Sequence, residues 1–171
     1  MIVFLDFDGV VHPEQLRRSS DLFCRLHLIE AVLREFPAVE IVISSAWRVK
    51  YENDELAVCK LREHFSHDIA PRVIGVTPQY KYLSPKDAPD GLSRFTRHWE
   101  CEVWIRRHRP PGTRWMAMDD RAYLFRPFCD NLMPFDRLEA FKQEHQDLLR
   151  QYLTALTQWT PWPAYCDRKL K

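Results

Sequence analysis

Apolar residues follow two alternating patterns along this chain, and the first of them predicts strands. Short, continuous apolar runs that are rich in β-branched side chains are typical of strands buried on both faces. Such runs occupy residues 2–5, 39–43, 72–76 and 115–118, and a weaker one lies around residues 131–133. Because strands of this kind belong inside parallel sheets, we expect the runs to pair side by side.

Between these runs, apolar residues recur at every third or fourth position, which predicts helices. The expected helices span about residues 21–36, 53–65, 97–107 and 136–156. Strands that alternate with helices predict an α/β fold: a Rossmann-like three-layer sandwich with a central parallel sheet covered on both faces. We expect one domain at residues 1–158, followed by an irregular Trp- and Pro-rich tail at 159–171.

Composition limits the class of protein. The 171 residues are 46% hydrophobic, which suits one globular domain, and the net charge of +1 gives no whole-molecule case for binding nucleic acid or anionic membrane. The five cysteines are widely spaced and odd in number, which favours reduced thiols and a cytoplasmic location. No stretch approaches the roughly 20 apolar residues of a membrane span, and the amino-terminal run is too short for a signal peptide.

Polar residues whose side chains could take part in catalysis follow three of the predicted strands. Asp6 and Asp8 come after the first strand, Ser44 after the second, and Asp119 with Asp120 after the fourth. The carboxyl ends of parallel strands meet at one edge of a sheet, where ligands bind in folds of this class. Each group taken alone is also compatible with an ordinary turn or a solvated loop. Their order and their shared position at strand ends favour a common site.

The residue types in this set suit phosphoryl transfer, in which catalysis is mostly positioning and charge neutralisation. Asp6 is the predicted nucleophile, and Asp8 the acid that protonates the leaving oxygen and later activates water. Ser44 offers a hydroxyl and a backbone N–H to a phosphoryl oxygen, and Arg97 offsets its charge. Three neighbouring residues are expected to contact the substrate: Gly9, Ser45 and Arg48.

The carboxylates also predict a metal site. Asp6, Asp119, Asp120 and the main-chain carbonyl of Asp8 supply the hard oxygen ligands that Mg²⁺ prefers. A divalent ion is needed because an anionic carboxylate must approach an anionic phosphate. Two rival functions remain open: a phosphoryl-accepting switch that does not turn over, and a catalytically silent interaction module built on the same fold.

The ordered motifs resemble those of the haloacid dehalogenase-like (HAD) superfamily of phosphatases. They are FLDFDGVVH at residues 4–12, IVISSAWR at 41–48, RHWECEVWI at 97–105 and WMAMDDR at 115–121. The combination looks like the HAD domain of Swiss Army Knife RNA repair proteins, and it is similar to the phosphatase half of polynucleotide kinase-phosphatases. The chain departs from that pattern where His98 and Trp99 follow Arg97, which leaves Arg94 as an alternative cation.

The chain has few residues available to form a cap over the site. The 20 residues 77–96 between the third strand and the third helix are too few for a lid domain, so we expect a minimal cap or none. The resemblance associates an open site with large phosphomonoesters such as nucleic-acid or nucleotide phosphate ends. Tyr80, Lys81 and Tyr82 could stack on a base and meet phosphate, or simply form a solvated loop. Likewise, Trp47 and Trp104 suit core packing or substrate stacking, and His12 suits substrate contact or a turn.

Overall fold

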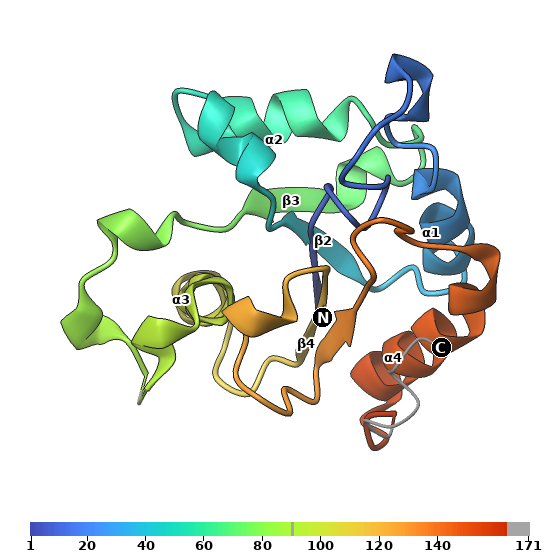
Figure 1. Cartoon of the computed structure of the whole chain (residues 1–171). Coiled ribbons are helices and arrows are strands. Elements are labelled where there is room, and N and C mark those ends of the chain that lie inside the picture. The colour runs from blue at the N-terminus through green and yellow to red at the C-terminus, as the bar shows by residue number, and fades with distance from the viewer. Residues whose placement is uncertain (90, 164–171) are drawn as a thin grey trace.

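The computed structural model describes residues 1–89 and 91–163, and its centre is a five-stranded parallel sheet (Figure 1). The strand order is β3-β2-β1-β4-β5. Their bounds are Ile2–Leu5 (β1), Glu40–Ile43 (β2), Val73–Val76 (β3), Trp115–Asp119 (β4) and Leu132–Pro134 (β5). All five strands that the apolar runs predicted are therefore present, and β1 lies at the centre of the sheet.

Helices cover both faces of the sheet, as the alternating pattern predicted. Helices α1 (Leu26–Leu33), α2 (Asp54–Arg62) and α4 (Gln146–Gln158) contribute to the core on one face, and α3 (Thr96–His108) packs on the other (Figure 1). Val3 and Leu5 belong to the first core, whereas Ile2 and Phe4 belong to the second. This alternation is the period of a strand, and it confirms the predicted three-layer α/β sandwich.

The register of the strands aligns their carboxyl ends. Leu5 of β1 lies opposite Ile43 of β2 and Met118 of β4. One residue further on, the Asp6 N–H donates to the Met118 carbonyl at 3.0 Å, and the Ser44 N–H donates to the Leu5 carbonyl at 2.9 Å. The polar residues that follow these strands therefore start from one rim of the sheet.

Two of the predicted helix starts were wrong, each because a non-glycine residue adopts a left-handed backbone. The helix predicted over residues 21–36 begins only at Leu26, after a 3-10 turn at Ser19–Asp21 (η1) and after Phe23, whose φ is +56°. The helix predicted from residue 136 begins at Gln146, because Ala140 has φ +57° and a further 3-10 turn, Gln143–His145 (η8), intervenes. A positive φ cannot be accommodated within a right-handed helix.

The connection from β3 to α3 carries no cap domain. Apart from residue 90, which is not described, it forms three short 3-10 turns: Tyr80–Tyr82 (η4), Pro85–Asp87 (η5) and Leu92–Arg94 (η6). The side of the sheet's carboxyl rim next to α3 is thus bordered by loops.

The predicted tail starts at the end of α4, and its described part lies against the body. The Trp162 ring is 5.9 Å from that of Tyr152, and the Arg114 guanidinium stacks 4.4 Å from the Trp162 centroid. Residues 164–171, which include Cys166, lie outside the described residues. Cys24, Cys59 and Cys101 are free thiols. None of the helices within residues 1–89 and 91–163 has the length and apolar character needed to span a bilayer.

Candidate active site

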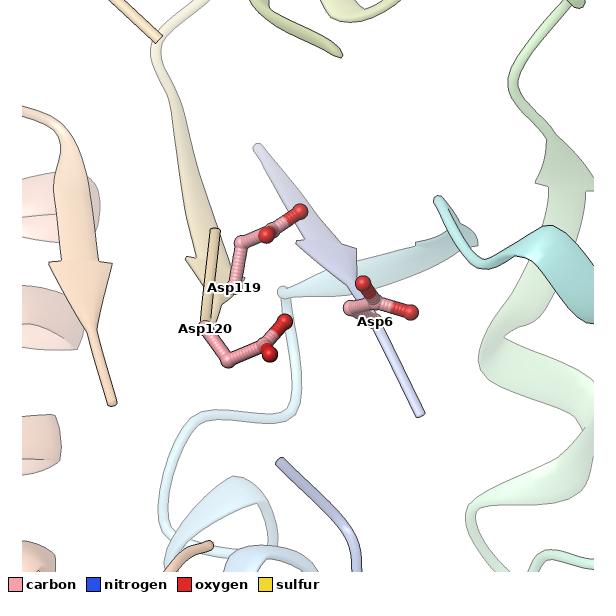
Figure 2. Close-up of side chains that lie close together, drawn as sticks. All are labelled: Asp6, Asp119 and Asp120. Carbon is pink, nitrogen blue, oxygen red and sulfur yellow. The ribbon is translucent and has the colours of Figure 1, made fainter. Parts of the chain in front are cut away.

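Three aspartates gather where β1 and β4 end. Asp119 and Asp120 project toward Asp6 (Figure 2), and one carboxylate oxygen from each lies within 4.8 Å of the others. Asp6 and Asp119 are almost completely buried. Carboxylates that are far apart in the sequence thus meet at the rim, as their position after parallel strands predicted.

The three aspartates are short of hydrogen-bond donors. The Asp119 Oδ1 accepts the Arg121 N–H at 2.8 Å, but Asp119 Oδ2 and both carboxylate oxygens of Asp120 are buried without a hydrogen-bond partner among the described residues. Burial raises the pKa of Asp119 against the opposing charge of Arg97, and burial together with the nearby Asp6 raises that of Asp120 to about 6. These buried carboxylate oxygens lack hydrogen-bond donors in the described part of the chain. Oxygen ligands of this kind suit Mg²⁺.

Arg97 is the cation of this site. It lies in the first turn of α3, and its Nη1 is 3.5 Å from Asp6 Oδ2 and 3.6 Å from Asp119 Oδ2. Arg94, the alternative, is an exposed residue of η6. A guanidinium beside the Asp6 and Asp119 carboxylates offsets part of their charge, and the buried position next to Asp6 favours Arg97 for the predicted role.

Ser44 presents only its hydroxyl to the site. Its N–H is committed to the Leu5 carbonyl at 2.9 Å, so the predicted contact of that N–H with a phosphoryl oxygen was wrong. The Ser44 Oγ lies 3.4 Å from Arg97 Nη1 and 3.5 Å from Thr77 Oγ1, which donates from the end of β3. The hydroxyl is therefore held between two donors, next to the guanidinium that contacts Asp6.

Gly9 shapes the acidic cluster. It has φ +72°, and a Cβ at this position would lie 2.7 Å from the Cβ and Cγ of Asp120. Both the backbone conformation and this close approach require glycine. The structure thus shows a positioning contribution for Gly9, and its predicted contact with substrate stays a prediction.

Asp8 occupies a different environment from the other three aspartates. The Trp47 Nε1–H lies 3.1 Å from each Asp8 carboxylate oxygen, and His12 Nε2 lies 3.1 Å from Asp8 Oδ1. The hydrogen bond from His12 is the largest cause that lowers the pKa of Asp8, and the Trp47 bond adds to it. The Asp8 carboxylate is not a member of the cluster formed by Asp6, Asp119 and Asp120, so the predicted metal contact of this residue rests on its main-chain carbonyl.

Trp47 makes a contact that neither sequence interpretation included. It is half-buried and donates to Asp8, whereas Trp104 is 3% exposed and packs edge-on against Phe4 at 5.9 Å. The core interpretation therefore holds for Trp104. For Trp47, no pattern in the sequence indicates a bond to a residue 39 positions earlier.

Two of the residues that were predicted to contact substrate form hydrogen bonds to other residues of the protein. The Arg48 guanidinium donates to the carbonyls of Ser45, Thr77 and Pro78 and to Glu100 Oε2 at 2.8 Å. These bonds use four of its five N–H groups. The Ser45 Oγ accepts the Trp47 N–H at 3.4 Å and caps the 3-10 turn Ala46–Lys50 (η2). Direct contact of either residue with substrate stays a prediction.

Glu100 is a site residue that the sequence reasoning missed. Its buried carboxylate bonds Arg48, accepts the Tyr80 N–H at 2.8 Å, and lies 3.7 Å from Arg97 Nε. It thereby connects the cation of the site to the loop that follows β3. A signal was available, because a glutamate three residues after Arg97 lies on the same face of a helix.

A hollow opens beside Arg97. This cavity of about 390 Å³ is bordered by η2, η4, the start of α3 and the 3-10 turn Ala122–Leu124 (η7). Tyr80 and Tyr123 line it and are 50% and 72% exposed, and Lys81 and Arg121 add positive charge. It therefore combines aromatic and cationic side chains next to the candidate site.

Comparison with known proteins agrees with this arrangement. The family model for the HAD domain in Swiss Army Knife RNA repair proteins matches residues 2–145, a range that includes all five strands and all the site residues described above. Searches of curated proteins and of solved structures found no match. The chain therefore belongs to this family of HAD domains, and its membership indicates a phosphatase-type hydrolase that acts on a phosphorylated substrate.

Proposed function

We propose that this protein is a Mg²⁺-dependent phosphatase that uses Asp6 as the nucleophile on phosphomonoesters. The observation that carries the proposal is the position of Asp6 at the end of β1. There its carboxylate lies with two other carboxylates on one side and with the Arg97 guanidinium 3.5 Å away. A nucleophile with cationic partners at hand is what attack on an anionic phosphoryl group requires.

Asp6, Asp119 and Asp120 would hold the ion, since their carboxylates include the buried oxygens without donors. When bound, Mg²⁺ supplies positive charge that lets an anionic carboxylate approach an anionic phosphate. Arg97 offsets negative charge on the transferred group, and the Ser44 hydroxyl, which lies 3.4 Å from Arg97 Nη1, orients one phosphoryl oxygen.

The reaction then proceeds in two displacements. A carboxylate oxygen of Asp6 forms a bond to phosphorus while the bond to the ester oxygen breaks, and Asp8 gives its proton to that departing oxygen. Water next attacks phosphorus of the aspartyl phosphate. Asp8 takes a proton from this water, phosphate leaves, and the Asp6 carboxylate is restored.

Nucleic-acid or nucleotide phosphate ends are the leading substrate class. The cavity beside Arg97 supports this choice, because Tyr80 and Tyr123 expose aromatic surface on which a base can stack. Lys81 and Arg121 place positive charge beside it, as a polynucleotide backbone requires. The family's association with RNA repair points the same way.

The test is phosphate release by the full chain, with and without Mg²⁺, first from an aryl phosphate. We then compare 3′-phosphorylated oligonucleotides, mononucleotides and sugar phosphates. Mg²⁺-dependent turnover, fastest on oligonucleotide ends, is expected. A stable acyl phosphate without turnover would instead identify a phosphoryl-accepting switch, and no phosphoryl chemistry with Mg²⁺ present would contradict the proposal.

A further inference from the structure

The geometry points to Trp47 and His12 as positioning residues that orient Asp8 for proton transfer to the leaving group. This inference rests on the proposed function, which gives no role to Trp47 or His12. Asp8 is the most exposed of the four aspartates at the rim of the sheet, with 32% of its side chain accessible. A carboxylate that is free on one side needs anchoring if it is to meet a leaving oxygen in one orientation.

Trp47 anchors Asp8 through its indole N–H, which lies 3.1 Å from both carboxylate oxygens. The indole is itself fixed in place. Its ring packs edge-on against Phe7 at 5.9 Å and Phe23 at 5.4 Å, and its N–H on the main chain bonds the Ser45 Oγ at 3.4 Å. A donor shared by two oxygens from a locked ring restricts the carboxylate's rotation about χ2.

His12 supplies the second anchor, and its surroundings fix the orientation of the ring. The imidazole is 1% exposed, and its Nδ1 accepts the Phe23 N–H at 3.4 Å. Because Nδ1 accepts this bond, Nε2 carries a proton and donates it to Asp8 Oδ1 at 3.1 Å. The two side chains thus hold Asp8 from two directions.

Phe23 adds an independent indication that this arrangement is maintained against a cost. Its φ is +56°, which is unfavourable for a bulky residue, and its ring stacks on His64 at 4.0 Å with an interplanar angle of 16°. Strained backbone of this kind persists where surrounding contacts over-determine it, and it concentrates at functional sites. Here the strained residue presents its N–H to His12.

The consequence appears in the step that breaks the ester bond. As the bond from phosphorus to the leaving oxygen breaks, the proton on Asp8 passes to that oxygen. An aryl oxygen leaves readily as an anion, whereas an alkyl oxygen needs this proton. Loss of the anchors should therefore slow alkyl phosphates much more than aryl phosphates, since only the former depend on a well-placed acid.

The experiment compares kcat/KM for 4-nitrophenyl phosphate and for a simple alkyl phosphate in the wild type and in Trp47→Phe. This substitution keeps an aromatic ring and removes the donor. We expect kcat/KM for the alkyl ester to fall by about 10- to 100-fold and that for the aryl ester to change by less than about 3-fold. His12→Phe should give the same selective loss.

Trp99→Phe is the matched control, because Trp99 is buried and its Nε1 has no hydrogen-bond partner among the described residues. It should leave the ratio between the two substrates unchanged. Thermal melts of each variant establish that it is folded. An equal change for both substrates in Trp47→Phe and His12→Phe, or no change, would overturn the inference. Absence of hydrolysis by the wild type would overturn the proposed function, and this inference with it.

Discussion

Two acidic regions lie close together at the rim of the sheet, and they are built in opposite ways. Asp6, Asp119 and Asp120 form a cluster in which three carboxylate oxygens have no hydrogen-bond donor among the described residues. Asp8, only two positions after Asp6, receives donors from both Trp47 and His12. Burial raises the pKa of Asp119 and Asp120, whereas hydrogen bonds lower that of Asp8.

The comparison shows how one residue type acquires two chemical environments. Carboxylates without donors are costly unless a cation joins them, so the first region suits a metal ion. A carboxylate with fixed donors is satisfied by the protein itself and stays oriented, which suits proton transfer. The side chains around each aspartate, more than the aspartate itself, determine which of these two environments it has. Single substitutions can therefore change one region and leave the other intact.

The largest effect is expected when either role is removed. In Asp6→Asn, hydrolysis should fall by about 10³-fold or more, and no phosphoenzyme should form, because the nucleophile is gone. In Asp8→Asn, an aryl phosphate should still phosphorylate Asp6, but hydrolysis of the acyl phosphate should slow, so acid-quenched samples should retain labelled protein. Asp54→Asn, at an exposed position in the first turn of α2, is the control. Equal labelling of the Asp6→Asn and Asp8→Asn variants would contradict the division.

Gly9→Ala should disturb the acidic cluster selectively. The new Cβ would lie 2.7 Å from Asp120 atoms at φ +72°, so Asp120 must move, and Mg²⁺ affinity should fall by about 10- to 100-fold. Gly112→Ala is a matched control, because Gly112 has φ +81° but nothing within 4 Å of the added carbon. Both variants should lose about 1 kcal/mol of stability from backbone strain. Calorimetric Mg²⁺ titration separates them, and unchanged affinity in Gly9→Ala would refute the positioning of Asp120.

Glu100→Gln should weaken catalysis by about 10-fold through its neighbours. The amide removes the negative charge that faces Arg48 at 2.8 Å and Arg97 at 3.7 Å, but it keeps the size of the side chain. Arg97 should then be less well oriented toward Asp6, so kcat should fall more than the affinity for substrate. Steady-state kinetics test this expectation. An unchanged kcat would mean that Arg97 is positioned without Glu100.

The smallest expected effect is a dependence of Mg²⁺ stabilisation on pH. Because the pKa of Asp120 is raised to about 6, the metal-free fold favours its protonated form and loses stability as pH rises from about 4 through 6. Mg²⁺ binds the deprotonated form, so the increase in Tm that it causes should be larger at pH 8 than at pH 5. A change of 1 kcal/mol corresponds to about 2–4 °C in a protein of this size.

Asp8 provides the contrast in the same experiment. Its lowered pKa means that its stabilising contribution is lost only as pH falls below its ordinary value of 3.8, outside the range measured. Thermal melts at the two pH values, with and without Mg²⁺, make the comparison. An equal shift in Tm at both would show that the acidic cluster does not take up protons as proposed.

The sequence predicted the strands and the meeting of the aspartates because both follow from local patterns. Buried parallel strands need continuous apolar runs, and the carboxyl ends of such strands share one edge of the sheet. Asp6, Ser44 and Asp119 each follow or end a strand, so their convergence required no knowledge of side-chain packing. Family motifs strengthened the choice of Arg97 over other arginines.

What the sequence did not reveal depends on contacts across the fold. The left-handed conformations at Phe23 and Ala140, which delay two helices, leave no mark in the apolar pattern. The bond from Trp47 to Asp8 joins residues 39 positions apart, and the Arg48–Glu100 pair joins residues 52 positions apart. Such partners are fixed by tertiary packing. A pattern read along one element cannot identify them.

The proposed function requires that the carboxylates of Asp6, Asp119 and Asp120, and not that of Asp8, hold a divalent ion. Anomalous diffraction from crystals of the protein soaked in Mn²⁺, a substitute for Mg²⁺, tests it most directly. We predict a single strong peak within about 2.0–2.3 Å of oxygens from Asp6 and from Asp119 or Asp120, with the Asp8 carboxylate still bonded to Trp47. A peak bound to the Asp8 carboxylate, or no ion at the rim at saturating Mn²⁺, would contradict this account.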